Sequence, residues 1–134
     1  MEIRGKFVFS IRGLVVDFDH IEQNLLLAPT KKIKKGELLS VSKKKSQDNV
    51  WSYEKEITSQ DKDELSQLYA LLEDLYPYRD YISSLRKYYS QVMIDCYLRS
   101  DFGQMGFSMN SSMLNILAEL KLDINFHLLS YGEA

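Results

Sequence analysis

The stretch Lys6-Phe-Val-Phe-Ser-Ile-Arg12 alternates between large apolar and mostly polar side chains. Phe7, Phe9 and Ile11 occupy every second position. Successive side chains of a β-strand point to opposite faces, so this period predicts a strand with one buried and one exposed side. A sheet built from such strands needs helices on only one of its faces.

The same period recurs along the chain. We expect further strands at residues 32–41, 50–57, 92–99 and 123–130. In the last two, the residues expected to face inward are Val92, Ile94, Cys96 and Leu98, and then Ile124, Phe126 and Leu128. Residues 100–108 contain two glycines, which suggest a turn and a short return strand.

Helical spacing appears between these strands, at residues 17–27, 60–75, 78–89 and 110–120. Asp19 followed by Glu22 resembles a capping box for the first helix, and Pro29 ends it. Pro77 is expected to interrupt or kink the helical region between residues 60 and 89. Asn110 or Ser111 can cap the last helix.

The order of elements predicts one α+β domain over residues 1–134. It runs strand, helix, strand, strand, helix, strand, the short return strand, helix and strand. The economical arrangement is a mixed, largely antiparallel sheet with helices packed mainly on one face. The polar face of that sheet must then meet solvent or a partner.

Composition places the chain among ordinary globular proteins, with 45% hydrophobic and 27% charged residues in 134. Its single cysteine, Cys96, cannot form an intramolecular disulfide. The sequence shows no signal peptide and no apolar run long enough to cross a bilayer. We therefore expect a soluble cytoplasmic protein that does not bind membranes.

Basic residues are concentrated in two lysine clusters flanking residues 37–41. They are Lys31, Lys32, Lys34 and Lys35, followed by Lys43, Lys44 and Lys45. One interpretation is a charged hairpin that resists edge-to-edge association, and the other is a site for an anionic partner. We favour the first, because no aromatic residue or arginine lies among the lysines to recognise bases or phosphates, and nucleic acid is therefore a disfavoured partner.

Several short motifs also occur in a characteristic order. They are Ala28-Pro29-Thr30, residues 35–37 (Lys-Gly-Glu), Trp51, residues 95–97 (Asp-Cys-Tyr), residues 106–108 (Gly-Phe-Ser) and residues 122–126 (Leu-Asp-Ile-Asn-Phe). This order resembles the bacterial domain-of-unknown-function family 4279 over roughly residues 6–128. The resemblance implies a stand-alone bacterial α+β domain, and it supplies no established reaction, cofactor or catalytic residue.

Residues that could carry catalysis are scarce. Any mechanism that requires histidine must use His20 or His127. Asp95, Cys96 and His127 could form a Cys-His-Asp arrangement, but adjacent strand residues point to opposite faces, so Cys96 should face the core. Metal-ligand spacings and phosphate-binding loops are also lacking, and we expect neither a metal nor a cofactor.

The leading interpretation is a non-catalytic binding domain that uses the polar face of its sheet. The candidate face comprises Ser10, Arg12, Trp51, Tyr53, Asp95, Tyr97, Arg99, Asn125 and His127. Aromatic residues and arginine are enriched in protein-binding hot spots, so we expect a protein partner. By analogy with other small acidic domains, a toxin-neutralising immunity protein is one version of this reading.

Three alternatives stay open. The first is a small enzyme with a cleft near residues 100–108, which a pocket holding Asp101 or His127 beside a second titratable group would favour. The second is nucleic-acid binding through the lysine hairpin. The third is self-association through an uncovered strand edge.

Overall fold

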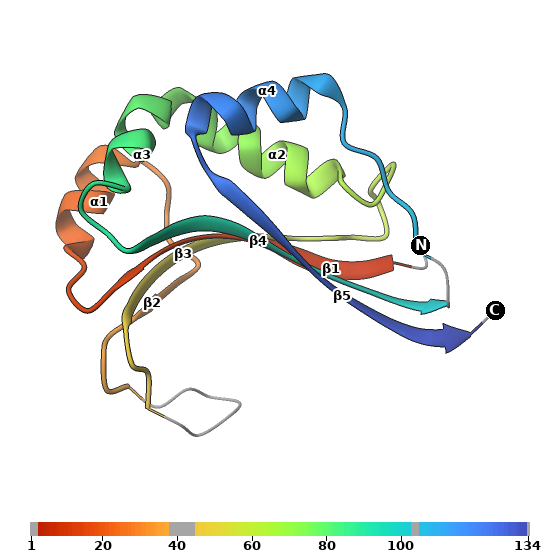
Figure 1. Cartoon of the computed structure of the whole chain (residues 1–134), viewed down its shortest axis with the longest axis horizontal. Coiled ribbons are helices and arrows are strands. Elements are labelled where there is room, and N and C mark those ends of the chain that lie inside the picture. Colours follow the sequence, from red (N-terminus) through yellow and green to blue (C-terminus); the bar gives the residue numbers. More distant parts are fainter. Residues whose placement is uncertain (1–2, 38–44, 103–104, 134) are drawn as a thin grey trace.

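Five strands form one sheet in the computed structural model, which describes residues 3–37, 45–102 and 105–133 (Figure 1). The strands are β1 (Ile3–Gly13), β2 (Lys31–Ile33), β3 (Asn49–Glu56), β4 (Gln91–Phe102) and β5 (Asp123–Glu133). Their order across the sheet is β2-β3-β1-β4-β5. All neighbours are antiparallel except β4 and β5, which are parallel and joined through a helix. The mixed, largely antiparallel sheet is therefore confirmed.

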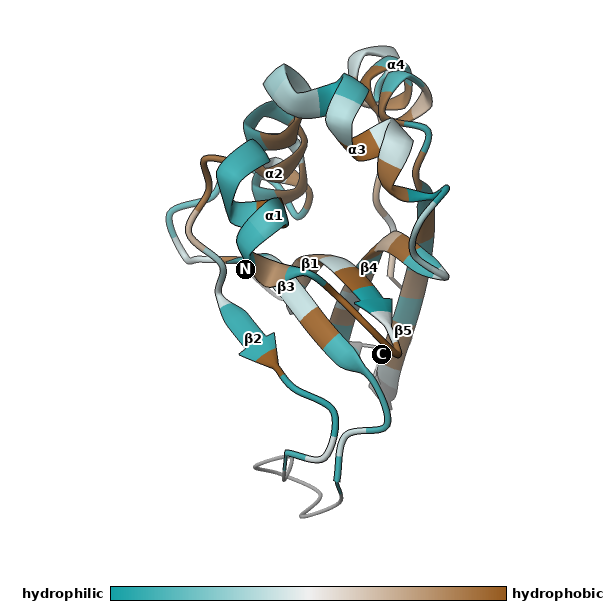
Figure 2. Cartoon of the chain, turned by 90° about the vertical axis from the view of Figure 1, so that its left-hand side faces the viewer, coloured by the Kyte–Doolittle hydropathy of each residue, from teal (hydrophilic) through white to brown (hydrophobic). Residues whose placement is uncertain are grey.

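The helices all lie on one side of this sheet, as predicted (Figure 1). They are α1 (Phe18–Asn24), α2 (Ser66–Leu75), the 3₁₀ turn η1 (Tyr76–Tyr78), α3 (Arg79–Leu85) and α4 (Ser111–Leu120). Pro77 lies in η1, so the expected interruption of the helical region is confirmed. Figure 2 shows hydrophobic residues on α2 and α4, whereas β2 and α1 are mainly hydrophilic.

The core lies between the sheet and the helices. On β1, Phe7, Phe9 and Ile11 are fully buried, as the alternation predicted. They pack in one cluster with leucines of α2 such as Leu68 and Leu72. This burial explains why the helices cover only the apolar side of the strands.

Some boundaries differ from the expected ones because local side-chain bonds decide them. The N-cap of α1 is Asp17, whose carboxylate accepts a hydrogen bond from the backbone N–H of His20, and the expected box at Asp19 is wrong. At α4 the cap is Asn110, one of the two expected residues.

Other corrections concern strands and exposure. β2 ends at Ile33, and residues 38–41 of the expected strand 32–41 lie outside the described residues. β4 continues to Phe102, and residues 105–108 form no strand, so within the described residues the return strand is wrong. Leu128, expected to face inward as core, is 55% exposed because it lies on an edge strand.

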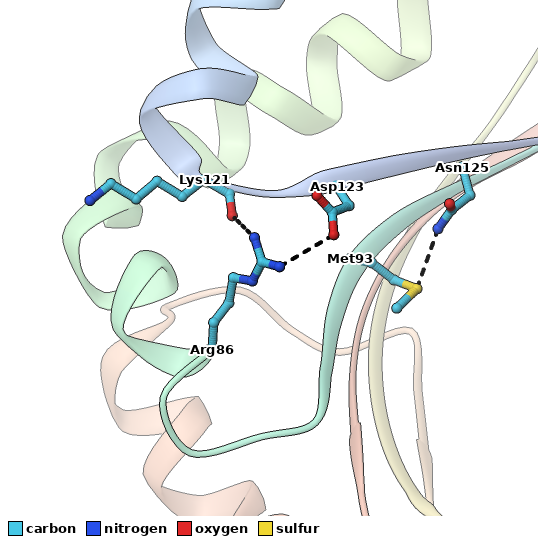
Figure 3. A network of polar contacts seen from close by, with 5 residues as sticks. All are labelled: Arg86, Met93, Lys121, Asp123 and Asn125. Atoms are coloured by element: carbon cyan, nitrogen blue, oxygen red, sulfur yellow. Dashed lines mark hydrogen bonds and ion pairs between the residues drawn. The ribbon is translucent and has the colours of Figure 1, made fainter.

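Arg86 joins three elements at one end of the sheet (Figure 3). Its guanidinium donates a hydrogen bond of 2.8 Å to the Lys121 carbonyl and lies 3.3 Å from the Asp123 carboxylate. Lys121 is the C-cap of α4, with the left-handed φ of 56°, and Asp123 begins β5. The arginine thus fixes the turn through which the chain enters its parallel strand.

Replacing Arg86 with alanine should lower the free energy of unfolding by about 1 kcal/mol, because a charge-assisted bond to a helix-terminal carbonyl is lost while the exposed ion pair contributes little. Urea unfolding of the two proteins measures the difference. Arg86→Lys should retain part of the stability. Unfolding curves that coincide for wild type and Arg86→Ala would contradict this role.

The strands bend away from the helices toward their ends, so the uncovered side of the sheet is concave (Figures 1 and 2). We call this side the concave face. It is formed by the side chains that alternate with the core residues along each strand. No helix covers it in the described parts of the chain.

Candidate functional site

The register between strands assembles the concave face into rows that cross the sheet. One row holds Glu56, Lys6, Tyr97 and His127, and the next holds Glu54, Val8, Asp95 and Asn125. On one side of these rows Arg4 lies opposite Arg99, followed by Leu129. Residues far apart in the sequence are therefore neighbours on this surface.

Seven residues of the candidate face lie together on the concave face. They are Ser10, Arg12, Asp95, Tyr97, Arg99, Asn125 and His127. All come from β1, β4 and β5. For these strands the sequence predicted correctly which side chains face the core and which face away from it.

Trp51 and Tyr53 do not belong to the concave face, and their predicted placement is wrong. Trp51 is fully buried in the core, 6.3 Å from Phe9 in an edge-to-face arrangement. Tyr53 packs against the same core, and its hydroxyl donates a 2.7 Å hydrogen bond to Asp74 of α2. Burying the large indole ring of Trp51 under the helices stabilises the folded protein, whereas leaving the ring on the exposed polar face would not.

The centre of the site is a stacked pair of rings. Tyr97 and His127 lie with ring centroids 4.6 Å apart and an interplanar angle of 13°. His127 Nε2 lies 2.9 Å from Oδ1 of Asp95, which is almost buried between neighbouring strands. A buried carboxylate needs a polar partner, so the imidazole satisfies Asp95 and is itself held in one orientation.

Tyr97 is 38% exposed on this face. Partial burial raises the pKa of its phenol, the Asp95 carboxylate raises that pKa further, and the Arg12 charge opposes the shift. The hydroxyl is therefore a neutral hydrogen-bond donor at ordinary pH. A neutral ring with one polar end suits a contact residue.

The charges near Val8 neutralise one another. Glu54 lies 3.6 Å from Lys6 Nζ and 3.8 Å from Lys31 Nζ, while Asp95 is paired with His127. These contacts leave the middle of the concave face without a strong field of either sign.

Small residues form the floor of the concave face. Val8, Ser10, Val50 and Ser52 are all buried although no helix covers them. The Oγ of Ser10 has no hydrogen-bond partner in the described part of the chain. The indole N–H of Trp51, in the core on the other side of the sheet, is also buried without a partner among the described residues, so this feature does not by itself mark a site.

A depression of about 790 Å³ lies at the end of the face where Arg4 and Arg99 meet. Its lining residues on the concave face are Arg4, Lys6, Glu56, Tyr97, Arg99, His127 and Leu129. The volume falls within the range of small-ligand pockets. Arg4, Lys6, Glu56 and Leu129 were missed by sequence reasoning, because strand register brings them together and no local pattern marks them.

Cys96 points away from this site into the core, as predicted. Burial raises the pKa of its thiol to about 12, and the neighbouring Asp95 charge adds to the effect. The arrangement of Cys96 with His127 as nucleophile and base is therefore excluded, since they lie on opposite faces of the sheet.

The thiol should accordingly be inert in the folded protein. At pH 8 a thiol with a pKa near 12 is almost entirely protonated, and only the thiolate attacks a disulfide reagent. We expect no release of the chromophore from 5,5′-dithiobis(2-nitrobenzoic acid) by native protein and one equivalent in denaturant. Rapid labelling of the native protein would contradict the buried placement.

Two of the described lysines of the hairpin are paired with carboxylates. Lys31 is paired with Glu54, and Lys32 lies 3.4 Å from Glu22 of α1. Lys34, Lys35 and Lys45 are exposed, and Lys43 and Lys44 lie outside the described residues. The ion pairs weaken the case for an anionic partner at β2, and whether the cluster binds one stays a prediction.

A second depression, of about 690 Å³, lies between α1 and α3. His20 Nδ1 lies 2.9 Å from the Tyr81 hydroxyl, and the Asp17 N–H donates to the Tyr89 hydroxyl at 3.3 Å. These contacts join α1 to α3 and already satisfy the polar groups. Tyr88, which lines this depression, is 77% exposed and follows the end of α3 at Leu85, so the expected helix 78–89 is longer than the observed one.

No group of three or more His, Cys, Asp or Glu side chains within the described ranges could hold a metal ion. None of the helices described is both long enough and apolar enough to cross a membrane.

Comparison with known proteins supports the order of motifs. A family model described as "Domain of unknown function (DUF4279)" matches residues 2–131. The match confirms the resemblance found in the sequence. Neither the curated proteins nor the solved structures contain a significant match.

Proposed function

The chain belongs to the DUF4279 family, and we propose that it is a non-catalytic binding domain that holds a protein partner on the concave face of its sheet. The observation that carries this proposal is that the concave face lies bare of helices and presents the exposed side chains of Tyr97 and Leu129. A second layer placed on this face would bury the exposed side chains that rise above the floor, among them Tyr97 and Leu129.

The residues that stand above the floor favour a protein as the partner. Tyr97 and His127 form a rigid aromatic pair, with Arg99 and the half-exposed Leu129 beside them. Tyrosine and arginine are the side chains most enriched in binding hot spots, and a stacked ring loses little conformational entropy on binding. Glu54 is already paired with Lys6 and Lys31, so covering this part of the face would not leave its charge without a partner.

Site-specific photo-crosslinking in the source cell tests the proposal. A benzophenone amino acid replaces Tyr97 in one protein and Tyr88 in another. Tyr88 is a matched control because it is an exposed tyrosine on the helical side, which the proposal leaves free. We expect a discrete protein adduct at position 97 and none at position 88.

The outcomes are distinct. An adduct at position 88 alone, identical adducts at both positions, or no protein adduct at position 97 would each refute a partner on the concave face.

A second function is favoured by the Asp95–His127 pair. The imidazole lies in the 790 Å³ depression and is held 2.9 Å from a carboxylate, the geometry in which an aspartate orients a general base. The lining residues of this depression lie on β1, β4 and β5 and at the end of β3, and they include none of the described residues between 100 and 108, where the enzyme alternative placed its cleft. The described residues place no serine, cysteine or threonine among its lining, so the chemistry would be activation of water.

Hydrolysis of p-nitrophenyl acetate and p-nitrophenyl phosphate by wild type and His127→Gln tests this second function. Turnover that falls by about 10²-fold or more in the variant would support it. Equal rates, or no turnover above buffer, would reject it for these substrates and leave the binding proposal as it stands.

A further inference from the structure

Two arginines face each other across the pairing of β1 and β4. Arg4 and Arg99 are register partners, so their side chains leave the sheet on the same side. Directly opposed residues of an antiparallel pair have Cβ atoms about 5 Å apart, and like charges in that position are destabilising. Such an arrangement calls for a compensating anion.

The protein supplies only part of that compensation. Arg4 Nη2 lies 3.2 Å from Oδ1 of Asp101, but both side chains are more than half exposed, so solvent screens the pair. Arg99 makes no ion pair or side-chain hydrogen bond with any other residue in the described ranges. One guanidinium of the two is therefore left without a counter-charge.

The surroundings of Arg99 have the shape of a site. The 790 Å³ depression is lined by three cationic side chains, Arg4, Lys6 and Arg99, and Glu56 is the one carboxylate among its described lining residues. The Tyr97 hydroxyl is a further donor at the same place, and Leu129 supplies an apolar wall. The Arg99 guanidinium and the Tyr97 hydroxyl can donate hydrogen bonds to a planar carboxylate, and the Leu129 side chain can pack against the methylene groups of an acidic residue.

We propose that the Arg4–Arg99 end of the concave face is a carboxylate-binding site that receives a glutamate or aspartate side chain of the protein partner. This inference rests on the proposed function and adds to it the chemistry of the segment that is bound. Arg99 would hold the carboxylate through its two parallel N–H donors, with Arg4 supplying charge across the strand pair.

A nucleic acid fits the same observations less well. Its backbone needs a continuous track of cations, whereas the next row of the face contains the carboxylates Glu54 and Asp95. The exposed lysines near β2 lie at the opposite edge of the sheet from β5. A single concentrated spot of positive charge favours one carboxylate on an otherwise neutral polypeptide segment.

Selection of a phage-displayed library of random dodecapeptides on the purified protein tests the site. We expect enriched peptides to share an Asp or Glu. Isothermal titration calorimetry then compares the best synthetic peptide with its Asp→Asn or Glu→Gln form. Either this change or Arg99→Gln should weaken binding by about tenfold or more, and the two changes together should cost little beyond either alone.

Two control variants accompany Arg99→Gln. Arg79→Gln removes the same charge from the helical side, where Arg79 stacks on Tyr76, and should leave the dissociation constant unchanged. Arg99→Lys keeps the charge without the fork and should give intermediate affinity. The urea midpoint of Arg99→Gln should stay equal to that of wild type or rise, because the opposed charges are relieved.

The outcomes separate this inference from the proposed function. Peptides that lose affinity in Tyr97→Ala but are indifferent to Arg99→Gln, or that share no acidic residue, would overturn the carboxylate site and leave the concave face intact. Peptides that ignore both variants, or no enrichment at all, would overturn both proposals. Displacement of the peptide by a single-stranded DNA dodecamer at equal concentration would assign the site to nucleic acid instead.

Discussion

Gly5→Ala should lower the free energy of unfolding by about 3 kcal/mol, a large part of the stability of a domain of this size. A Cβ added at Gly5 would lie 1.8 Å from the carbonyl oxygen of Tyr97, and a carbonyl of the central strand pair cannot move aside as a flexible side chain can. The backbone φ of 156° at Gly5 adds to the cost, since residues with a side chain rarely adopt it. The substitution must therefore push β1 and β4 apart.

The matched control is Gly106→Ala. Nothing lies within 4 Å of a Cβ at Gly106, so this change should alter stability by no more than about 0.5 kcal/mol. Urea unfolding followed by circular dichroism measures both variants. If Gly5→Ala were as stable as Gly106→Ala, the close approach of the strands at Tyr97 would be wrong, and with it the shape of the pocket beside it.

Trp51→Ala should cost about 3–5 kcal/mol, because it empties the largest fully buried side chain of the core. Trp51→Phe should cost much less. A phenyl ring keeps the edge-to-face contact with Phe9, and the lost indole N–H has no hydrogen-bond partner among the described residues. Chemical unfolding of the two variants gives both differences.

The pair of Trp51 variants also decides between two positions for the residue. Had Trp51 stood on the concave face as a contact residue, its truncation would change stability by only a few tenths of a kcal/mol, as is usual at the surface. A small effect of Trp51→Ala would therefore contradict the core placement. Resistance of the tryptophan fluorescence to iodide quenching is an independent readout of the same burial.

Alternation identified the sheet because a period of two depends only on local geometry. On β1 the apolar side is unmistakable, so Ser10 and Arg12 were assigned to the correct face. On β3 the two sides are less distinct, since Trp51 and Tyr53 alternate with Val50 and Ser52. Alternation shows which residues share a side, but burial against α2 decides which side faces inward.

The pocket could not be predicted for a different reason. Arg4 and Arg99 are 95 positions apart, and only the pairing register of β1 and β4 makes them opposite. Glu54 and Glu56 enter the face from β3 in the same way. Sequence patterns gave the faces of individual strands, whereas the juxtaposition of charges depends on register and strand order.

The two histidines lie in different surroundings, and only one of them lies on the candidate binding surface. Both lie in depressions, but His20 is bonded to Tyr81 in a contact that joins two helices, whereas His127 lies half exposed beside Asp95 and Tyr97 on the uncovered sheet. Polar groups that are already satisfied between helices serve the fold. The exposed Tyr97–His127 pair and the uncompensated Arg99 charge distinguish the concave face as the place for a partner.

Mapping of amide chemical shifts in a ¹⁵N-labelled sample, titrated with the tightest peptide from the dodecapeptide selection, tests the concave face most directly. The expected result is that the largest shifts fall on β1, β4 and β5 around Lys6, Tyr97 and His127, with α1 and α3 unaffected. Largest shifts in the lysine-rich segment near β2, or in the depression between α1 and α3, would contradict the account.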